Sequence, residues 1–430
     1  MLGIPKGFRD FPPEVMMPRL NVIKKIRKVF ELYGFPPMDT PVIEHWETLS
    51  GKYGEEAEKL LIWRFEDPFS GRMYALRYDL TVPLARFVAM HPEPPLPFKR
   101  GQISLVWRHE EPQRMRYREF LQADADIIGS PYPEADAEVL NVISRALREL
   151  GVGDFVARVN HRGLLYNLFE KELGLTNPIP VYRAIDKLDK IGEEGVRKEL
   201  EKIGLSSTSV EKIMNIIKLR GQPDTLLEKL QSTIGKKKPL DDLETIYNLS
   251  EHPDAFLLDI SLVRGLDYYT GPIMEFGLKN AMSPSLAGGG RYDELIGLFR
   301  KAGTLPATGA SIGVERVIDV LREKGVITTR KKTSSIVQVV YLTENLRHEA
   351  WRLATHLREE GIPSEIDLNR RNQTKQRKHA QKLGIRFVII LGENEVKTGK
   401  FTLYDRETGE RIQSDIKSII NMLKRYAIST

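Results

Sequence analysis

Residues 107–122 read WRHEEPQRMRYREFLQ. Pro112-Gln113 near the middle of this stretch predicts two strands joined by a loop. From Tyr74 to Gly129, short apolar segments likewise alternate with turns rich in Pro, Gly and Arg, which is typical of an antiparallel sheet. The sequence therefore predicts an α+β domain built on a central antiparallel sheet.

Helical patterns flank this predicted sheet. Apolar residues recur at three- and four-residue spacing from Pro18 to Gly34 and again from Val139 to Leu150. Residues from about 170 to 250 are rich in Lys, Glu and Leu with helical periodicity, which predicts a helical insertion. We expect residues 1–325 to form this larger domain.

A second, smaller domain is expected at the C-terminal end. Residues 326–335 are polar and lack periodicity, so they predict a linker. From 336 to 430, strand-like and helix-like segments alternate. This alternation predicts an α/β domain with an open, mostly parallel sheet.

Composition excludes several classes of protein. The 430 residues carry 65 Lys and Arg against 59 Asp and Glu, a net charge of +6. The absence of Cys excludes disulfides, thiolate metal sites and a cysteine nucleophile. The longest apolar run, Phe387 to Leu391, is far shorter than the roughly 20 residues of a membrane helix. The N-terminus has no apolar signal core, so we expect a cytoplasmic protein without a membrane partner.

Arginines are concentrated in three segments. Residues 107–122 hold four of them, whose planar guanidinium groups suit phosphate oxygens, although a solvated strand with alternating charge pairs fits this segment equally well. The segment 264–271, RGLDYYTG, places an arginine beside two tyrosines, and Arg316 stands in the first turn of a predicted helix. The helix dipole disfavours a cation there, which indicates an external anionic or π partner for Arg316.

The C-terminal domain carries its own basic segment. Asn369 to Arg386 contains seven Lys and Arg and no acidic residue. This predicts a basic helix face for a nucleic-acid backbone, with a solvated surface helix as the alternative.

A hydrolase is a further alternative. Residues 309–313, GASIG, match the G-x-S-x-G pattern of a nucleophilic serine. Asp319 and then His348, His356 or His379 follow in the order of a catalytic triad. The competing interpretation is a tight strand-to-helix junction that requires small residues.

Taken together, the motifs resemble the histidyl-tRNA synthetase family of class II aminoacyl-tRNA synthetases. Residues 78–86, YDLTVPLAR, are similar to the amino-acid loop of that family, and 107–122 to its motif 2. RGLDYYTG resembles the segment peculiar to the histidine enzymes, and 312–316 resembles motif 3. Pro41 stands where the motif 1 proline of the dimer interface is found.

The resemblance implies ATP-dependent ligation of L-histidine to tRNA(His) through a histidyl-adenylate, by a homodimer that uses ATP as substrate and Mg²⁺. It implies catalytic roles for Arg108 and Arg264. The implied histidine-binding residues are Asp79, Thr81, Arg108, Gln122, Asp126, Arg264, Tyr268 and Tyr269. The implied ATP-binding residues are Arg108, Glu110, Arg118, Arg264 and Arg316. The implied tRNA-binding residues are Gln113, Arg114, Arg116, Arg370, Arg371, Lys375 and Arg377, and the metal ligands are unknown.

One departure and one alternative accompany this resemblance. Positions 79 and 126 hold Asp where bacterial relatives tend to carry Glu, a shorter reach that a backbone shift or water must meet. The alternative is the synthetase-like regulatory subunit of ATP phosphoribosyltransferase, which does not charge tRNA. It typically lacks the C-terminal domain and loses the motif residues, whereas both are intact in this chain.

Overall fold

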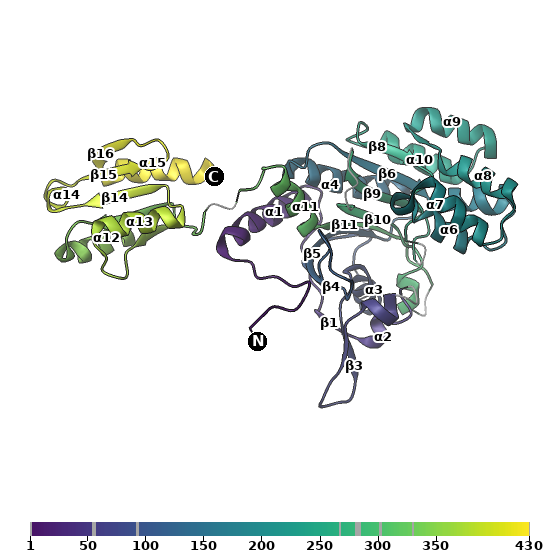
Figure 1. Cartoon of the computed structure of the whole chain (residues 1–430), viewed down its shortest axis with the longest axis horizontal. Coiled ribbons are helices and arrows are strands. Elements are labelled where there is room, and N and C mark those ends of the chain that lie inside the picture. The colour runs from purple at the N-terminus through teal and green to yellow at the C-terminus, as the bar shows by residue number, and fades with distance from the viewer. Residues whose placement is uncertain are drawn as a thin grey trace. The chain divides into compact units, whose positions relative to one another are not determined.

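The computed structural model describes residues 2–53, 57–91, 94–265, 268–279, 285–300, 303–328 and 331–429. The chain forms two compact units. One consists of Met1–Arg9 and Asn21–Val326, and the other of Asp10–Leu20 and Ile327–Thr430. Figure 1 traces both units from the N-terminus to the C-terminus.

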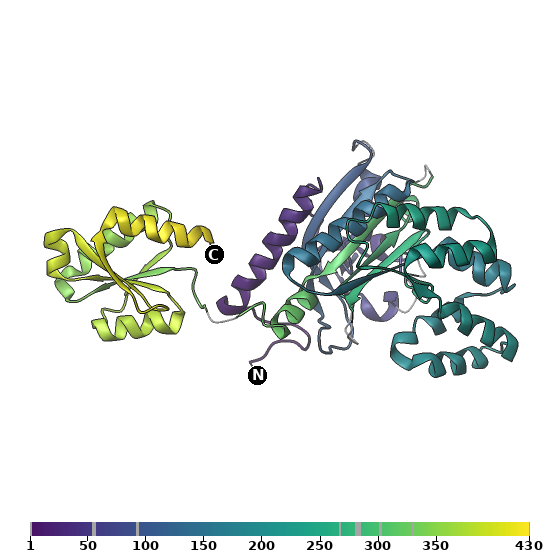
Figure 2. The ribbon, with the colours of Figure 1, turned by 90° about the horizontal axis from the view of Figure 1, so that it is seen from above.

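An eight-stranded sheet is the centre of the first unit (Figure 2). Among the described strands, six neighbouring pairs are antiparallel and one pair, β6 with β8, is parallel. The sheet is therefore mixed, whereas an antiparallel sheet was predicted. In spatial order the strands are β4 (Phe98–Trp107), β5 (Glu119–Ile128), β11 (Ala307–Gly313), β10 (Ala287–Arg291), β9 (Pro272–Leu278), β6 (Phe155–His161), β8 (Phe256–Asp259) and β7 (Arg220–Gly221).

Strands β4 and β5 confirm the pattern predicted around Pro112-Gln113. They pair over ten residues each, from Phe98 opposite Ile128 to Trp107 opposite Glu119. Residues 108–118 connect them as a loop, in which Gln113 and Arg116 form a single bridge. The loop therefore joins the end of β4 to the start of β5.

Helices cover this sheet. Helix α4 (Pro133–Leu150) packs on β5 and β11, begins with a proline at its first position and ends at Gly151, whose φ of 77° provides the left-handed cap. Helix α1 (Pro13–Leu32) begins before Pro18, which was expected to precede it and lies inside the helix instead. The other helices include α3 (Thr81–Met90) and α11 (Val314–Glu323), and η3 (Ile296–Phe299) is a 3₁₀ turn.

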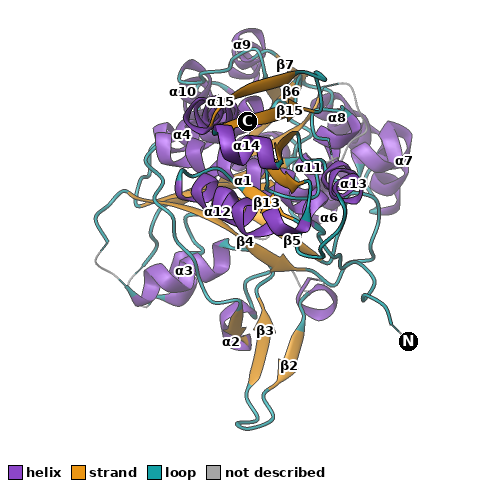
Figure 3. Ribbon diagram, turned by 90° about the vertical axis from the view of Figure 1, so that its left-hand side faces the viewer, coloured by secondary structure: helices purple, strands orange, loops and turns teal. Residues whose placement is uncertain are grey.

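A small three-stranded sheet extends from the first unit. Its strands, in order β1-β3-β2, are antiparallel. Figure 3 shows β2 and β3 as a projecting hairpin. The elements of this region are β1 (Ile43–His45), α2 (Trp46–Leu49), η1 (Ala57–Leu61), β2 (Arg64–Glu66) and β3 (Met73–Leu76).

Helices dominate the segment where an insertion was predicted. Figures 1 and 2 show them grouped near the edge of the sheet that β8 and β7 form. The segment is not wholly helical, because β7 lies within it and pairs with β8. Its elements are α5 (Arg162–Leu165), η2 (Tyr166–Glu172), α6 (Ile179–Ile185), α7 (Leu188–Lys202), α8 (Ser207–Ile217), α9 (Pro223–Ile234) and α10 (Lys238–Asn248).

The second unit contains a five-stranded sheet in the order β13-β12-β14-β15-β16. Its pairs β12·β13 and β12·β14 are parallel, and β14·β15 and β15·β16 are antiparallel. The sheet is thus mixed rather than mostly parallel, because β15 and the unpredicted β16 form a hairpin. The elements are β12 (Val337–Tyr341), η4 (Glu344–Leu346), α12 (Arg347–Glu359), β13 (Ser364–Ile366), α13 (Gln373–Leu383), β14 (Phe387–Leu391), α14 (Glu393–Thr398), β15 (Lys400–Asp405), β16 (Arg411–Asp415) and α15 (Ile416–Ser429).

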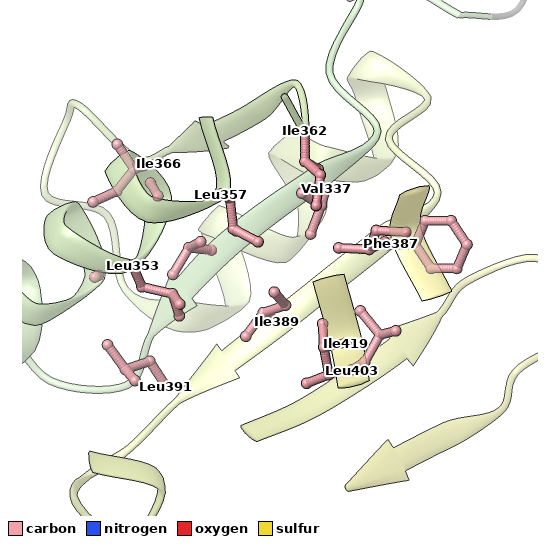
Figure 4. Packing of buried hydrophobic residues seen from close by; sticks show 14 of the residues in the cluster. Val337, Leu353, Leu357, Ile362, Ile366, Phe387, Ile389, Leu391, Leu403 and Ile419 are labelled. Carbon is pink, nitrogen blue, oxygen red and sulfur yellow. The ribbon is translucent and has the colours of Figure 1, made fainter. Parts of the chain in front are cut away.

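The side chains of β12 and β14 pack alternately into two hydrophobic cores, one on each face of the sheet. Val337 and Ile389 pack with Leu357 of α12 and Ile419 of α15, as Figure 4 shows. Their neighbours, such as Val340 and Val388, pack on the opposite face with Ala380 of α13. Burial on both faces explains the continuous apolar run of β14.

None of the described helices combines the length and the apolar character that a membrane-spanning segment requires.

Candidate active site

Two cavities of the first unit adjoin each other and share part of their lining. The first has a volume of about 180 Å³ and the second about 200 Å³. Four residues line both: Arg108, Gln122, Gly288 and Ser311. A molecule in the first cavity can therefore reach one in the second at this junction.

Arg108 is held at the junction by its neighbours. Its Nε donates to the backbone oxygen of Tyr78 at 3.2 Å, and its Nη2 donates to Oε1 of Gln122 at 3.3 Å. Its guanidinium carbon also lies 4.4 Å from the centre of the Tyr78 ring and 5.3 Å from that of Phe120. The cation is thereby preorganised where the two cavities join.

The first cavity is rich in cations. Arg116, Arg264 and Arg316 line it together with Arg108. The guanidinium of Arg316 donates to the backbone oxygen of Met115 at 3.1 Å and to that of Ser285 at 2.9 Å. Burial, and then repulsion from neighbouring arginines, lowers the pKa of Arg316. Such a concentration of positive charge favours a polyanionic ligand.

Arg264 lies at the more open side of the first cavity. Its Nη1 is 2.8 Å from Oε1 of Glu275, and half of its side chain is exposed. It is not among the residues that line the second cavity, so the structure does not bring it to the site predicted for histidine. Leu266 and Asp267 of the same motif lie outside the described residues.

The second cavity is acidic and aromatic. Asp79 stands just before α3, where its Oδ1 accepts hydrogen bonds from the Tyr53 hydroxyl and the Val82 amide, both at 3.0 Å. Burial raises the pKa of the Asp79 carboxyl. The hydroxyl groups of Tyr268 and Tyr269 lie 3.3 Å apart, and both tyrosines line this cavity.

The face of β5 supplies three polar groups to the second cavity. Gln122, Asp124 and Asp126 alternate along the strand and are all buried. Asp126 accepts a hydrogen bond from the Tyr292 hydroxyl. Arg100, opposite it on β4, lies 3.0 Å from its Oδ2.

Sequence reasoning missed four residues around this cavity, namely Tyr53, Arg100, Asp124 and Tyr292. Asp124 had a usable signal, because a two-residue period from Gln122 to Asp126 places it on the same face. Tyr53, Arg100 and Tyr292 come from other segments of the chain. Strand register and the packing between elements bring these three residues to the cavity.

Comparisons with known proteins show which family the chain belongs to. A histidyl-tRNA synthetase family model matches residues 7–317, and an anticodon binding domain model matches 336–426. The chain belongs to the histidyl-tRNA synthetase family. It is 53% identical to the histidine–tRNA ligase of Aeropyrum pernix over 98% of this chain and 97% of that one. It is 48% identical to that of Korarchaeum cryptofilum, which covers 99% of each chain.

A solved histidyl-tRNA synthetase has the same architecture. The crystal structure from Nostoc sp. PCC 7120 matches with a TM-score of 0.87 and 32% identity, over 99% of both chains. The mixed sheets of both units are therefore features of a known synthetase fold.

Ser311 does not have the surroundings of a nucleophile in this member of the family. It lies within β11, opposite Asp124, and its hydroxyl accepts a hydrogen bond from Gln122. Asp319 accepts a hydrogen bond from the Tyr117 hydroxyl at 2.7 Å. Among the described residues, no histidine lines either cavity. A Cβ on Gly309 would lie 2.0 Å from Asp126, so close packing accounts for the first glycine of the pattern.

Other predicted residues of the synthetase site lie in the 108–118 loop. Glu110 and Arg116 line the first cavity and pair with each other at 3.2 Å. Arg118 is not among the lining residues, and its Nε donates to the backbone oxygen of Glu110 at 2.9 Å. Gln113 and Arg114 are exposed, and Arg114 pairs with Glu323.

The predicted basic residues of the anticodon-binding domain differ in their surroundings. Arg370 and Lys375 are exposed, and Arg370 lies 3.6 Å from Glu344. Arg371 is held by Asp367 at 3.0 Å, and Arg377 lies over the ring of Tyr404. Arg370 and Lys375 are the more exposed of these four cations and are therefore the better placed to contact a nucleic-acid backbone.

The described residues contain no group of three or more His, Asp or Glu side chains that could hold a metal ion. Glu110 is a carboxylate on the wall of the first cavity. Mg²⁺ is usually bound by one or two carboxylates together with substrate phosphates, so this donor set fits an ion that arrives with a nucleotide.

Proposed function

We propose that this chain ligates L-histidine to tRNA(His) in two steps through a histidyl-adenylate, as a cytoplasmic homodimer. The observation that carries the proposal is the junction at Arg108 and Gln122 between a cationic cavity and an acidic, tyrosine-lined cavity. The first suits ATP and the second suits an amino acid with a polar ring. Membership of the family and the names of the full-length relatives support the same assignment.

Histidine occupies the second cavity in this proposal. Asp79, Thr81 and Gln122 accept its α-ammonium group, and Asp126 and Tyr269 bond its ring nitrogens. Its carboxylate then points towards Arg108, since that residue lines both cavities. A site that satisfies both ring nitrogens rejects isosteres, because its own buried polar groups would otherwise remain unpaired.

ATP occupies the first cavity, with its adenine on Arg316. A carboxylate oxygen of histidine attacks the α-phosphorus, a new P–O bond forms, and the bond to pyrophosphate breaks. Arg108 and Arg264 stabilise the negative charge that builds on the non-bridging oxygens, more strongly in the transition state than in the ground state. Glu110 would hold Mg²⁺ together with the nucleotide phosphates, and the ion would supply positive charge that offsets theirs.

The second step uses tRNA. The terminal adenosine hydroxyl attacks the carbonyl carbon of the adenylate, and AMP leaves. Support for the tRNA contacts comes from the exposed residues Gln113 and Arg114 of the 108–118 loop and from the match of 336–426 to an anticodon binding domain. Arg370 and Lys375 contact the phosphate backbone of tRNA in this proposal, with Arg371 and Arg377 beside them.

The regulatory-subunit alternative has less support. A solved protein from Bacillus halodurans, named as an ATP phosphoribosyltransferase regulatory subunit/histidyl-tRNA synthetase, matches with a TM-score of 0.74 at 24% identity, which is a likeness of fold alone. The full-length relatives at 53% and 48% identity are histidine–tRNA ligases.

Exchange of labelled pyrophosphate into ATP, measured with each of the twenty amino acids in turn, tests the proposal. We expect exchange with histidine and none with the others. Exchange with no amino acid, or with another one alone, would refute the assignment.

A further inference from the structure

Two buried carboxylates in the second cavity share a single buried cation. The Nη2 atom of Arg100 lies 3.0 Å from Oδ2 of Asp126 and 3.8 Å from Oδ2 of Asp124. None of the three side chains is more than 2% exposed. A buried charge is costly unless it is paired, so an unequal number of charges in a buried cluster calls for an explanation.

Arg100 connects the two walls of this cavity. It stands on β4 opposite Asp126 of β5. Its Nη2 also donates to the backbone oxygen of Leu80 at 3.0 Å, between Asp79 and Thr81 in the sequence, and its Nη1 donates to Gln102 at 2.8 Å. The guanidinium therefore fixes the β5 carboxylates relative to the start of α3.

Asp124 lies farther from the shared cation than Asp126 does. Asp126 has the Tyr292 hydroxyl and the closer contact with Arg100. Asp124 has Gln122 Nε2 at 3.5 Å, Arg100 at 3.8 Å and a hydrogen bond with the hydroxyl of Ser311, its neighbour on β11. A carboxylate has about four lone-pair positions, so Asp124 keeps acceptor capacity on the wall of the cavity.

We propose that Asp124 is a second acceptor for the imidazole ring of the substrate, and that Arg100 is the positioning residue that holds Asp124 and Asp126 against that ring. This inference rests on the proposed function. The cluster has one more carboxylate than it has guanidinium groups, and a ring N–H of the ligand supplies a further hydrogen-bond donor to it. Asp124 also compensates for the short side chain of Asp126, because a second carboxylate on the same face of β5 offers the ring another hydrogen-bond acceptor.

Steady-state pyrophosphate exchange with full-length Asp124→Asn and Arg100→Lys tests this inference. The two amino acids compared are histidine and β-(2-thienyl)alanine, whose ring is of similar size but has no N–H. Asp124→Asn removes a charge-assisted hydrogen bond, so we expect the KM for histidine to rise about tenfold while kcat changes by less than about threefold. The preference for histidine over the thienyl analogue should fall by a similar factor.

Arg100→Lys retains the positive charge but loses the planar fork that reaches both carboxylates. We expect a rise in the KM for histidine that is smaller than in Arg100→Met, together with an unchanged KM for ATP. The matched control is Asp259→Asn, because Asp259 is also buried and paired with an arginine, Arg158 at 2.9 Å, but lines neither cavity. This control should leave both the KM for histidine and the selectivity unchanged.

The outcomes separate this inference from the proposed function. Wild-type protein that exchanges with histidine, combined with an unchanged KM and selectivity in Asp124→Asn, would overturn the role of Asp124 only. An unchanged KM in Arg100→Lys would overturn the positioning role of Arg100. Wild-type protein without histidine-dependent exchange would refute the proposed function itself.

Discussion

The guanidinium of Arg108 donates to the side-chain oxygen of Gln122 across 3.3 Å, and both residues line both cavities. Arg108 directly follows the last residue of β4 and Gln122 belongs to β5, so the pairing of these strands sets the distance between them. The cation is thus aligned with the amino-acid cavity before any nucleotide binds. Such preorganisation reduces the free energy required to orient reactants in the transition state.

Arg264→Ala should abolish most adenylate formation without preventing histidine binding. Of the two cavities, the side chain lines only the cationic one, where the proposed mechanism places the α-phosphate. We expect kcat for pyrophosphate exchange to fall by about 10²–10³-fold, while calorimetry shows a histidine affinity within a factor of about three of wild type. Loss of histidine binding with an unchanged exchange rate would show that its role is assigned wrongly.

Gly309→Ala should impair histidine recognition specifically. The added Cβ would lie 2.0 Å from Oδ1 of Asp126, so this carboxylate must move. We expect the KM for histidine to rise by about tenfold or more, with little change in the KM for ATP. Gly277→Ala is the matched control, because it is also a strand glycine and a Cβ there meets no atom within 4 Å. Equal effects in both variants would contradict this explanation.

Asp124→Asn should make the folded protein more stable at neutral pH. Burial raises the pKa of this carboxyl above its value in the unfolded chain. A carboxyl of this kind costs stability above its unfolded pKa, and the cost grows as the pH rises towards the folded value. We expect Tm to rise by about 2 °C or more at pH 8, and the difference to vanish near about pH 4. Thermal scans over this range would measure it, and a lower Tm at pH 8 would refute the prediction.

Arg370→Ala combined with Lys375→Ala should weaken tRNA binding without affecting pyrophosphate exchange. Each exposed cation that contacts a phosphate releases a counterion, so the slope of log K against log salt should decrease by about two. Filter binding of tRNA(His) at several salt concentrations measures this slope. Lys417→Ala, on α15 at the other face of the sheet, should leave it nearly unchanged. Were the control to have the same effect as the double variant, α13 would not be the contact surface.

Local patterns predicted most of the secondary structure that positions the site. The loop between β4 and β5 follows from Pro112-Gln113, and helix α4 follows from its apolar spacing. Strand β16 was missed because its exposed and half-buried residues lack an apolar run, and this omission made the second sheet look mostly parallel. The interpretation of Ser311 as a nucleophile fails for a similar reason, since a five-residue pattern does not show what surrounds the side chain.

The residues that bind or react carry chemical information in their type and order, so the sequence alone was enough to indicate the family and the reaction. The roles it predicts for Arg108, Asp126 and Tyr269 stay predictions. The partners of these residues depend on which strands lie side by side. Arg100 meets Asp124 and Asp126 only because β4 pairs with β5 in one register, and Tyr292 reaches Asp126 only because β10 and β11 bring distant segments together. Tertiary structure therefore decided how the charges of the amino-acid cavity are balanced, because electrostatic pairing depends on distance in space and not on separation along the chain.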